Sequence, residues 1–245
     1  MEPQLLAGER IDQLFAQNIQ IIQSPEVFSF SLDAVLLANF PQLPKRGQIV
    51  DLCAGNGAVG LFMAHKTNAY ITQVELQPRL ADMGRRSIQL NQLDEQVTML
   101  NLDLKDAPQA IAPDSVDLVV CNPPYFKEAP TSQKNPNPHL AIARHELHTT
   151  LQEVIQVSAK LLKMNGRLAL VHRPDRFLEI IAAMDQAGIA PKRACFVYPK
   201  EGKEANMLLI EGIRHGKKDG FRVLPPLVVY QDNEYTPAVK ELLYG

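Results

Sequence analysis

The stretch that decides the fold is DLCAGNGAVG, residues 51–60. Its glycines Gly55, Gly57 and Gly60 follow the G-x-G-x-x-G spacing of a turn that joins a strand to a helix and holds a nucleotide. An acidic residue, Glu75, follows about 20 positions later, where a carboxylate that accepts hydrogen bonds from a ribose belongs. The stretch therefore predicts a strand–turn–helix unit that binds a nucleotide-like ligand.

Apolar runs alternate with segments of helical spacing over most of the chain. Such strands, apolar along their whole length, are typical of a parallel sheet covered on both faces by helices. The loop 199–205 is too short for a crossover helix, so the two strands that it joins are expected to run antiparallel. The sequence predicts an α/β fold with a mostly parallel seven-stranded sheet, an antiparallel terminal strand and helices on both faces. The predicted strands are residues 48–53, 70–75, 96–102, 115–121, 167–172, 193–198 and 206–214, and the predicted helices are 59–66, 78–91, 150–163 and 174–187.

Outside this alternation, residues 11–23 are expected to form an extended pair, and a short helix is expected to begin near Ser31. Asn165 and Gly166 are interpreted as a helix stop. The tail adds one more strand, 227–230, and a short helix. No linker divides the chain, so we expect a single domain over residues 1–245, made of an N-terminal segment that covers the ligand (1–45), a catalytic core (46–215) and a C-terminal extension (216–245).

Composition limits the function classes. The formal net charge is −2, so nucleic-acid binding would need a local basic patch. The cysteines, Cys53, Cys121 and Cys195, show no C-x-x-C spacing, which indicates a reducing compartment rather than disulfides or a zinc site. Charges near the N-terminus and the absence of a long apolar run favour a cytoplasmic protein without a membrane span. The oligomeric state is left open.

Polar residues are expected where the parallel strands end, which is where ligands of such sheets bind. Glu75 can accept both ribose hydroxyls, and Asp103 can accept from an adenine amine or merely cap a helix. Asp51 would repel the phosphates of a dinucleotide but would favour a ligand with a cation at that place. S-adenosylmethionine, which carries an ammonium and a sulfonium and no phosphate, meets this condition.

A second motif, Asn122-Pro123-Pro124-Tyr125, follows the apolar run 115–121. The lone pair of a conjugated NH2 group is delocalised, which makes the nitrogen a poor nucleophile. The side-chain oxygen of Asn122 and the main-chain oxygen of Pro123 can each accept one N–H and so free the lone pair to attack a sulfonium methyl. The prolines stiffen the turn, and Tyr125 offers a ring on which a base can stack.

These two motifs together resemble the class I, Rossmann-like methyltransferases that act on amino groups, except that Cys53 stands at the usual first glycine of the loop. Across nearly the whole chain, segments such as FSFSLDAVLLANF (28–40), CNPPYF (121–126) and VYPKEGKEANMLLIEG (197–212) resemble the bacterial tRNA(Val) adenine methyltransferase family. The resemblance implies transfer of a methyl group to the N6 amine of adenine 37, just 3′ of the anticodon. It also implies a donor site with Phe28 near the methionine end and Asp33 near its amine; the full expected set is Phe28, Asp33, Asp51, Cys53, Ala54, Gly55, Asn56, Gly57, Glu75, Leu76, Asp103, Leu104 and Asn122.

A tRNA substrate needs cations that contact its phosphates. Basic residues gather between residues 191 and 218, although such a cluster can also be an ordinary solvated surface. His145 and His148 have metal-like spacing but no third ligand nearby, so no metal is expected. Residues 126–144 show little periodicity, as functional or disordered loops do. The predicted RNA-binding residues are Arg144, Arg173, Lys200, Lys203, Lys217 and Lys218.

Other functions stay open at this point. The same amine chemistry would serve the N2 amine of a guanine in ribosomal RNA or a glutamine amide in a protein. The glycine spacing alone would also suit a nicotinamide-dependent oxidoreductase, and the fold could persist in an RNA-binding module without catalysis.

Overall fold

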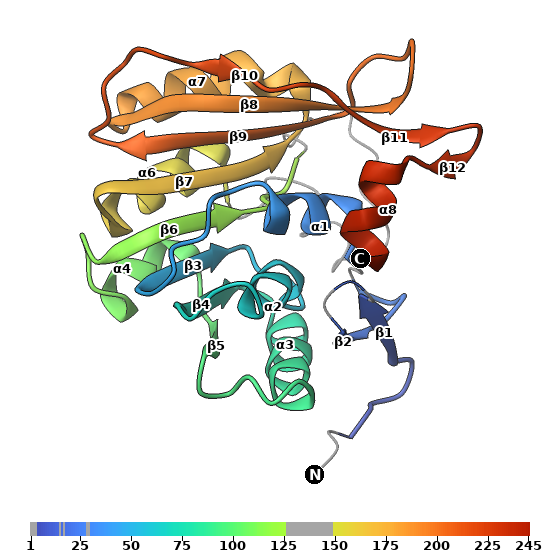
Figure 1. The fold of residues 1–245 in the computed structure, drawn as a ribbon. Coiled ribbons are helices and arrows are strands. Elements are labelled where there is room, and N and C mark those ends of the chain that lie inside the picture. The colour runs from blue at the N-terminus through green and yellow to red at the C-terminus, as the bar shows by residue number, and fades with distance from the viewer. Residues whose placement is uncertain (1–3, 15, 17, 28–29, 126–148) are drawn as a thin grey trace, which may run out of the picture.

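One central sheet organises the residues that the structure, a computed structural model, describes: 4–14, 16, 18–27, 30–125 and 149–245. Its strands are β3 (Gln48–Leu52), β4 (Tyr70–Glu75), β5 (Val97–Asn101), β6 (Val116–Cys121), β7 (Leu162–His172), β8 (Ile189–Lys200), β9 (Met207–Arg214), β10 (Arg222–Val223), β11 (Leu227–Gln231) and β12 (Glu234–Tyr235). Among the described residues these ten strands lie in the order β12-β11-β8-β9-β7-β6-β3-β4-β5, and β10 also pairs with β8 (Figure 1).

The strand directions confirm the predicted class I methyltransferase topology. Strands β5, β4, β3, β6 and β7 are parallel to one another, and β9 is inserted antiparallel between β7 and β8. The chain passes from β3 to β4 on one side and later places β6 on the other side of β3. Such a reversal of strand order opens a crevice at the carboxyl ends of the strands, where ligands of open α/β sheets bind.

Helices cover both faces of the sheet, as predicted (Figure 1). Strand β3 shows why, because its side chains alternate between two cores: Ile49 packs with residues of α1 and α2, whereas Val50 and Leu52 pack with residues of α6 and α7. The helices are α1 (Leu32–Asn39), α2 (Ala58–Ala64), α3 (Pro78–Leu90), α4 (Ala107–Ala110), α6 (Leu151–Leu161), α7 (Phe177–Gln186) and α8 (Pro237–Tyr244), with short 3₁₀ turns η2 (Leu104–Asp106) and η3 (Pro174–Arg176).

The predicted extended pair near the N-terminus is an antiparallel hairpin of β1 (Arg10–Leu14) and β2 (Ile19–Gln23). It lies on α3, where the Ile22 main-chain N–H donates to Ser87 Oγ. Its other attachment is to the glycine loop, because Asn56 Nδ2 donates to the main-chain oxygen of Ile22. The hairpin therefore supports the loop that begins α2.

The start of β7 was predicted five residues too late in the chain, at Arg167 instead of Leu162. Helix α6 ends at Leu161 and the strand follows at once, so Asn165-Gly166 is not a helix stop. Asn165 has φ 63°, and the pairing of β7 with β6 shifts register at this place. A side chain at Gly166 would approach the main-chain oxygen of Val116 to 2.9 Å. Asn165 and Gly166 therefore form a bulge in β7. A bulge and a helix stop both need a residue that tolerates a positive φ, which is why the sequence signal is the same.

A buried ion-pair network fixes the end of α1 to the sheet. Glu211 on β9 is 1% exposed and accepts from Arg167 of β7 at 2.9 Å and from Arg193 of β8 at 3.1 Å. Arg193 also donates to the main-chain oxygen of Phe40, 2.9 Å away, and its guanidinium lies 4.8 Å from the centroid of the Phe40 ring. Helix α1 thus has a fixed position over the sheet, which matters because it carries Asp33.

No helix among the described residues is both long enough and apolar enough to cross a membrane.

We expect Glu211→Gln to lower the free energy of unfolding by about 3 kcal/mol, because one partner of a buried ion-pair network is removed and two arginines lose their counter-charge. Urea denaturation followed by circular dichroism measures this. Glu234→Gln is the matched control, since it breaks the exposed pair with Lys240 and should change stability little or not at all. Equal stabilities of the two variants would contradict the prediction.

Candidate active site

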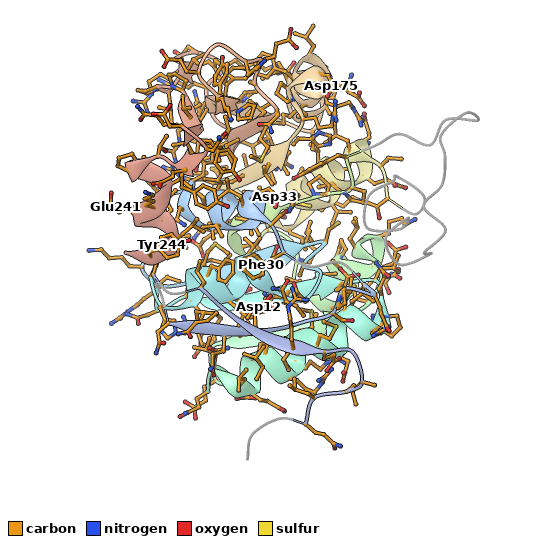
Figure 2. The ribbon with its side chains drawn as sticks, turned by 90° about the vertical axis from the view of Figure 1, so that its right-hand side faces the viewer. Asp12, Phe30, Asp33, Asp175, Glu241 and Tyr244 are labelled. Atoms are coloured by element: carbon orange, nitrogen blue, oxygen red, sulfur yellow. The ribbon has the colours of Figure 1, made fainter. Side chains whose placement is uncertain are left out.

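A cavity of about 310 Å³ lies where β3, β4 and β6 end. Its lining comes from the start of α1, the glycine loop after β3, the end of β4 and the turn after β6. Figure 2 looks onto this edge of the sheet, with Phe30 and Asp33 near the centre of the view. Predicted donor-binding and catalytic residues that line the cavity are Asp33, Cys53, Ala54, Gly55, Asn56, Glu75, Leu76, Leu104, Asn122, Pro123, Pro124 and Tyr125.

The glycines of the loop have two different roles. Gly55 has φ 57°, and a side chain there would meet nothing within 4 Å, so its backbone borders open cavity space. Gly57 and Gly60 instead press against Gln73 of β4, because a Cβ atom on either would come within 2.7 Å or 2.2 Å of that side chain. The second and third glycines therefore permit close packing of α2 on the sheet, and Gly57 does not line the cavity.

Glu75 is the best-anchored acid of the site. It is 6% exposed, and its two carboxylate oxygens accept from the main-chain N–H groups of Gly55 at 2.8 Å and Gln77 at 2.7 Å. Burial raises the pKa of this carboxyl, and the main-chain hydrogen bonds oppose that rise. Each oxygen keeps a further lone pair, so Glu75 can still accept hydroxyl groups from the cavity.

Asp51 lies beneath the cavity rather than in its wall. It is fully buried, and one oxygen accepts from the Gly60 N–H at 3.1 Å and lies 3.5 Å from Gln73 Nε2. Burial raises the pKa of the Asp51 carboxyl to about 7, against the lowering effect of these two donors. Its predicted contact with a cation of the ligand stays a prediction, while the structure shows it bonded to the first turn of α2.

Cys53, at the position of the usual first glycine, has a strained backbone conformation. Its φ is 57°, a left-handed conformation that favours glycine and costs a non-glycine residue about 1 kcal/mol or more. Its side chain lies near Cys121 at the end of β6, and burial raises the pKa of the Cys121 thiol well above its usual value. Cys121 therefore remains an uncharged thiol at neutral pH.

Tyr125 joins the second motif to α1. Its hydroxyl lies 2.7 Å from Asp33 Oδ2 and 2.6 Å from Asn122 Oδ1. Burial is the first cause that raises the pKa of this phenol well above its usual value, and the charge of Asp33 is the second. The structure thus brings the predicted catalytic asparagine and the predicted donor-amine partner to one hydroxyl group.

Two residues of β7 and η3 support Tyr125 from the side of the sheet. The His172 ring lies 5.2 Å from the Tyr125 ring, centroid to centroid, and Arg176 lies within 3.4 Å of its main-chain oxygen. His172 is fully buried, which lowers its pKa to about 4, so the imidazole is neutral at physiological pH. Its Nδ1 accepts from the Arg173 N–H, and its Nε2 has no partner among the described residues.

Asp103 caps a helical turn, which was the alternative to its role as a ligand of the donor. Its side chain accepts from the Lys105 N–H at 2.9 Å at the start of η2, and it does not line the cavity, although Leu104 does. Some predicted residues lie outside the described part of the chain: Phe28, Arg144, His145 and His148. The predicted loop 126–144 also lies outside it.

The predicted RNA-binding residues do not form one patch. Arg173 follows β7 and Lys200 ends β8, so both lie at the edge of the sheet that holds the cavity, and Lys203 is in the turn after β8. Lys217 and Lys218 follow β9, which runs the other way and ends beside the start of β8. Strand β8 is 12 residues long, so about 40 Å separates its two ends.

Several residues of the cavity wall were not predicted from the sequence. Thr149 precedes a Thr150–Glu153 capping box at the start of α6, a signal that was visible in the sequence as T-x-x-E. Phe30 belongs to the segment 28–40 that carries the family resemblance, and it packs edge-on against Phe62, with ring centroids 5.1 Å apart. The residues that were missed are Phe30, Ser31, Ala34, Ala58, Val59, Val74, Gln77, Leu80, Leu102 and Thr149.

The described residues hold no cluster of three or more histidine, cysteine or acidic side chains with the geometry of a metal site.

The family model described as methyltransferase small domain matches residues 18–187, more than half of the chain. The protein belongs to this family. It is an S-adenosylmethionine-dependent methyltransferase. The family match therefore favours S-adenosylmethionine over a nicotinamide cofactor as the ligand of the glycine loop.

Curated relatives carry a more specific name. The chain is 27% identical over 184 residues to the tRNA1(Val) (adenine(37)-N6)-methyltransferase of Photobacterium profundum, which covers 74% of this chain and 75% of that protein. It is 29% identical over 180 residues to the enzyme of the same name from Shewanella amazonensis, covering 74% and 76% of the two chains.

Solved structures show the same fold. A predicted O-methyltransferase from Agrobacterium tumefaciens has a TM-score of 0.69 at 23% identity and covers 86% of this chain and 94% of its own. Geranyl diphosphate C-methyltransferase from Streptomyces coelicolor, crystallised with S-adenosyl-L-homocysteine, has a TM-score of 0.56 at 15% identity and covers 74% and 79%. At these identities the likeness concerns the fold alone.

The cavity suits the donor of this family. Gly55 leaves space that a side chain would fill, Glu75 offers carboxylate oxygens for ribose hydroxyls, and Asp33 offers a negative charge for an ammonium group. Apolar side chains beside Glu75, among them Leu76 and Leu104, suit the faces of an adenine ring.

We expect Glu75→Gln to weaken binding of S-adenosylhomocysteine about 10- to 100-fold, because a charged acceptor of hydroxyl groups becomes neutral. Isothermal titration calorimetry measures the affinity. Asp103→Asn, at the end of the next strand but outside the cavity wall, is the matched control and should change the affinity less than about threefold. A larger loss in Asp103→Asn than in Glu75→Gln would show that the two acids were assigned the wrong way round.

The raised pKa of Asp51 predicts a pH effect on stability. Because the folded carboxyl holds its proton up to about pH 7 and the unfolded one releases it near pH 4, the contribution of Asp51 to stability falls as pH rises through this window. The side chain of Asp51→Asn cannot ionise. The free energy of unfolding of the variant, minus that of the unmodified protein, should therefore increase between pH 4.5 and 7.5. Urea denaturation at several pH values measures the difference; a constant difference would contradict the expected ionisation.

Proposed function

We propose that the protein transfers a methyl group from S-adenosylmethionine to the exocyclic N6 amine of an adenine in tRNA, namely adenine 37 of a valine tRNA. The observation that carries this proposal is the place of Asn122, which lines the same cavity as Glu75 and Asp33 and follows the central strand β6. A planar amine that reaches Asn122 would therefore meet the donor within one cavity.

The proposed chemistry requires two acceptors at the amine. Asn122 Oδ1 and the main-chain oxygen of Pro123 each accept one N–H, which localises the lone pair of the nitrogen. When bound, S-adenosylmethionine would supply an electrophilic methyl group on a positively charged sulfur; the transfer leaves neutral S-adenosylhomocysteine and releases one proton from the amine. Neutral His172, beside the Tyr125 ring, adds no positive charge that would repel that sulfur.

The prolines fix the direction of these acceptors. Pro123 is buried and Pro124 half-buried, and proline restricts the backbone rotation of the turn. Because the acceptors are held before the substrate arrives, little reorganisation is needed when charge develops on the nitrogen. The ring of Tyr125 supplies a surface on which the base can stack.

The names of the curated relatives support tRNA and adenine 37 as the finer assignment. The anticodon loop offers unpaired bases, which cost less to turn into a cavity than paired ones. Arg173, Lys200 and Lys203 lie at the cavity edge of the sheet and are the described cations proposed to contact the RNA; Lys217 and Lys218 would reach only a more distant part of it. The proposed site of action is the cytoplasm.

The proposed division of labour along the chain follows the same geometry. Residues 1–45 supply Phe30 and Asp33 to the cavity and form its cover, residues 46–215 supply the donor loop and the Asn122 turn, and residues 216–245 extend the sheet.

We expect Asn122→Ala to lower the rate of methyl transfer about 100- to 1,000-fold, because one acceptor that polarises the amine is lost. Binding of S-adenosylhomocysteine should change less than about threefold. Asn122→Asp, which keeps an acceptor oxygen in the same place, is the matched control and should retain more activity than Asn122→Ala. Unchanged turnover of Asn122→Ala would reject the proposed role.

The substrate is identified by mass spectrometry of nucleosides in tRNA and ribosomal RNA from a strain that lacks the gene. We expect N6-methyladenosine to disappear from one tRNA and to return with the gene but not with its Asn122→Ala form. Loss of N2-methylguanosine from ribosomal RNA, or of a methylated glutamine from a protein, would replace the proposed substrate with one of the alternatives.

A further inference from the structure

The Tyr125 hydroxyl has one proton to donate but lies close to two acceptor oxygens. It lies within hydrogen-bond distance of both Asp33 Oδ2 and Asn122 Oδ1, at 2.7 Å and 2.6 Å. The phenol keeps its proton, since burial and the charge of Asp33 raise its pKa. A neutral phenol can donate one hydrogen bond, so the two oxygens share one donor.

The two oxygens are the ones that methyl transfer needs. The other oxygen of Asp33 is held by its own helix, since Oδ1 accepts from Ser31 Oγ at 2.5 Å and from the Ala34 N–H at 2.9 Å. Oδ2 is therefore the oxygen left for a ligand, and Tyr125 lies on it. Asn122 Oδ1 is the acceptor for the substrate amine in the proposed reaction, and Tyr125 lies on it too.

We propose that the Tyr125 hydroxyl is a placeholder that couples the donor site to the acceptor site. The ammonium group of the donor competes with the hydroxyl for Asp33 Oδ2, and when the hydroxyl leaves, Asn122 Oδ1 becomes free to accept an N–H of the substrate. Asp33 is thus a positioning residue as well as a ligand of the donor. This inference rests on the proposed role of Asn122.

The surroundings of Tyr125 permit its side chain to move while its backbone stays. Its main-chain oxygen lies within 3.4 Å of Arg176, which is itself bonded to Glu179. On the ring side lies His172, whose Nε2 is a buried donor without a partner among the described residues. The side chain is half-buried and lines the cavity, so a turn about its first side-chain bonds does not require the sheet to open.

The coupling has a direct test that needs no RNA. Tyr125→Phe keeps the ring and removes the hydroxyl, so the ammonium of S-adenosylhomocysteine no longer competes for Asp33. We expect its affinity to rise about tenfold in calorimetry. Methylthioadenosine, which lacks the amino-acid part and hence the ammonium, should bind Tyr125→Phe and the unmodified protein equally well.

Two further variants separate this effect from a general change of shape. Asp33→Asn removes the shared charge, so adding Tyr125→Phe to it should no longer tighten S-adenosylhomocysteine binding. Tyr230→Phe, on β11 and outside the cavity wall, is the control and should leave both affinities unchanged. An unchanged or weaker affinity of Tyr125→Phe for S-adenosylhomocysteine, or equal changes for both ligands, would overturn the coupling. The proposed substrate is tested separately, by the nucleosides, so either idea can fail without the other.

Discussion

The close contact of the glycine loop with Gln73 is the constraint on which the candidate active site depends. Gln73 Nε2 donates to the main-chain oxygen of Gly57 at 2.7 Å. The same Gln73 side chain lies so close to Gly60 that a methyl group on Gly60 would not fit. This contact sets how near α2 lies to β4, and so where the loop turns away from the sheet. Gly57, at the end of the loop, and Gly60, in α2, pack against the sheet, whereas Gly55, earlier in the loop, borders the cavity.

Three carboxylates near the loop differ in their surroundings and therefore in their chemistry. Asp51 is buried beneath the loop and bonded to the start of α2, which makes it part of the framework. Glu75 is tied by two main-chain donors but still lines the cavity. Asp33 has one oxygen bonded within α1 and the other turned to Tyr125. Position along the sequence does not distinguish them; solvation and hydrogen bonding do.

The sequence predicted the parallel core well because buried strands and amphipathic helices leave a periodic signal, and because the loop 51–60 has few alternative structures. The prediction was wrong at Asn165-Gly166, because the same residue pair is compatible with a helix stop and with a bulge in a strand. It also grouped Lys200 with Lys217, although the antiparallel course of β8 and β9 places these two lysines at opposite ends of β8. The hydroxyl of Tyr125 between Asp33 and Asn122 could not be predicted, since contacts between residues far apart in the chain depend on the finished packing.

The C-terminal strands have a consequence for colloidal behaviour. Strand β8 is long, and β10 and β11 both pair with its outer side, one after the other. They cover a row of backbone donors and acceptors that would otherwise be open to another chain. The new outer border is short and broken, and Lys240 and Glu234 place charges beside it. Residues 222–245 therefore leave a shorter edge for pairing with another chain than β8 alone would.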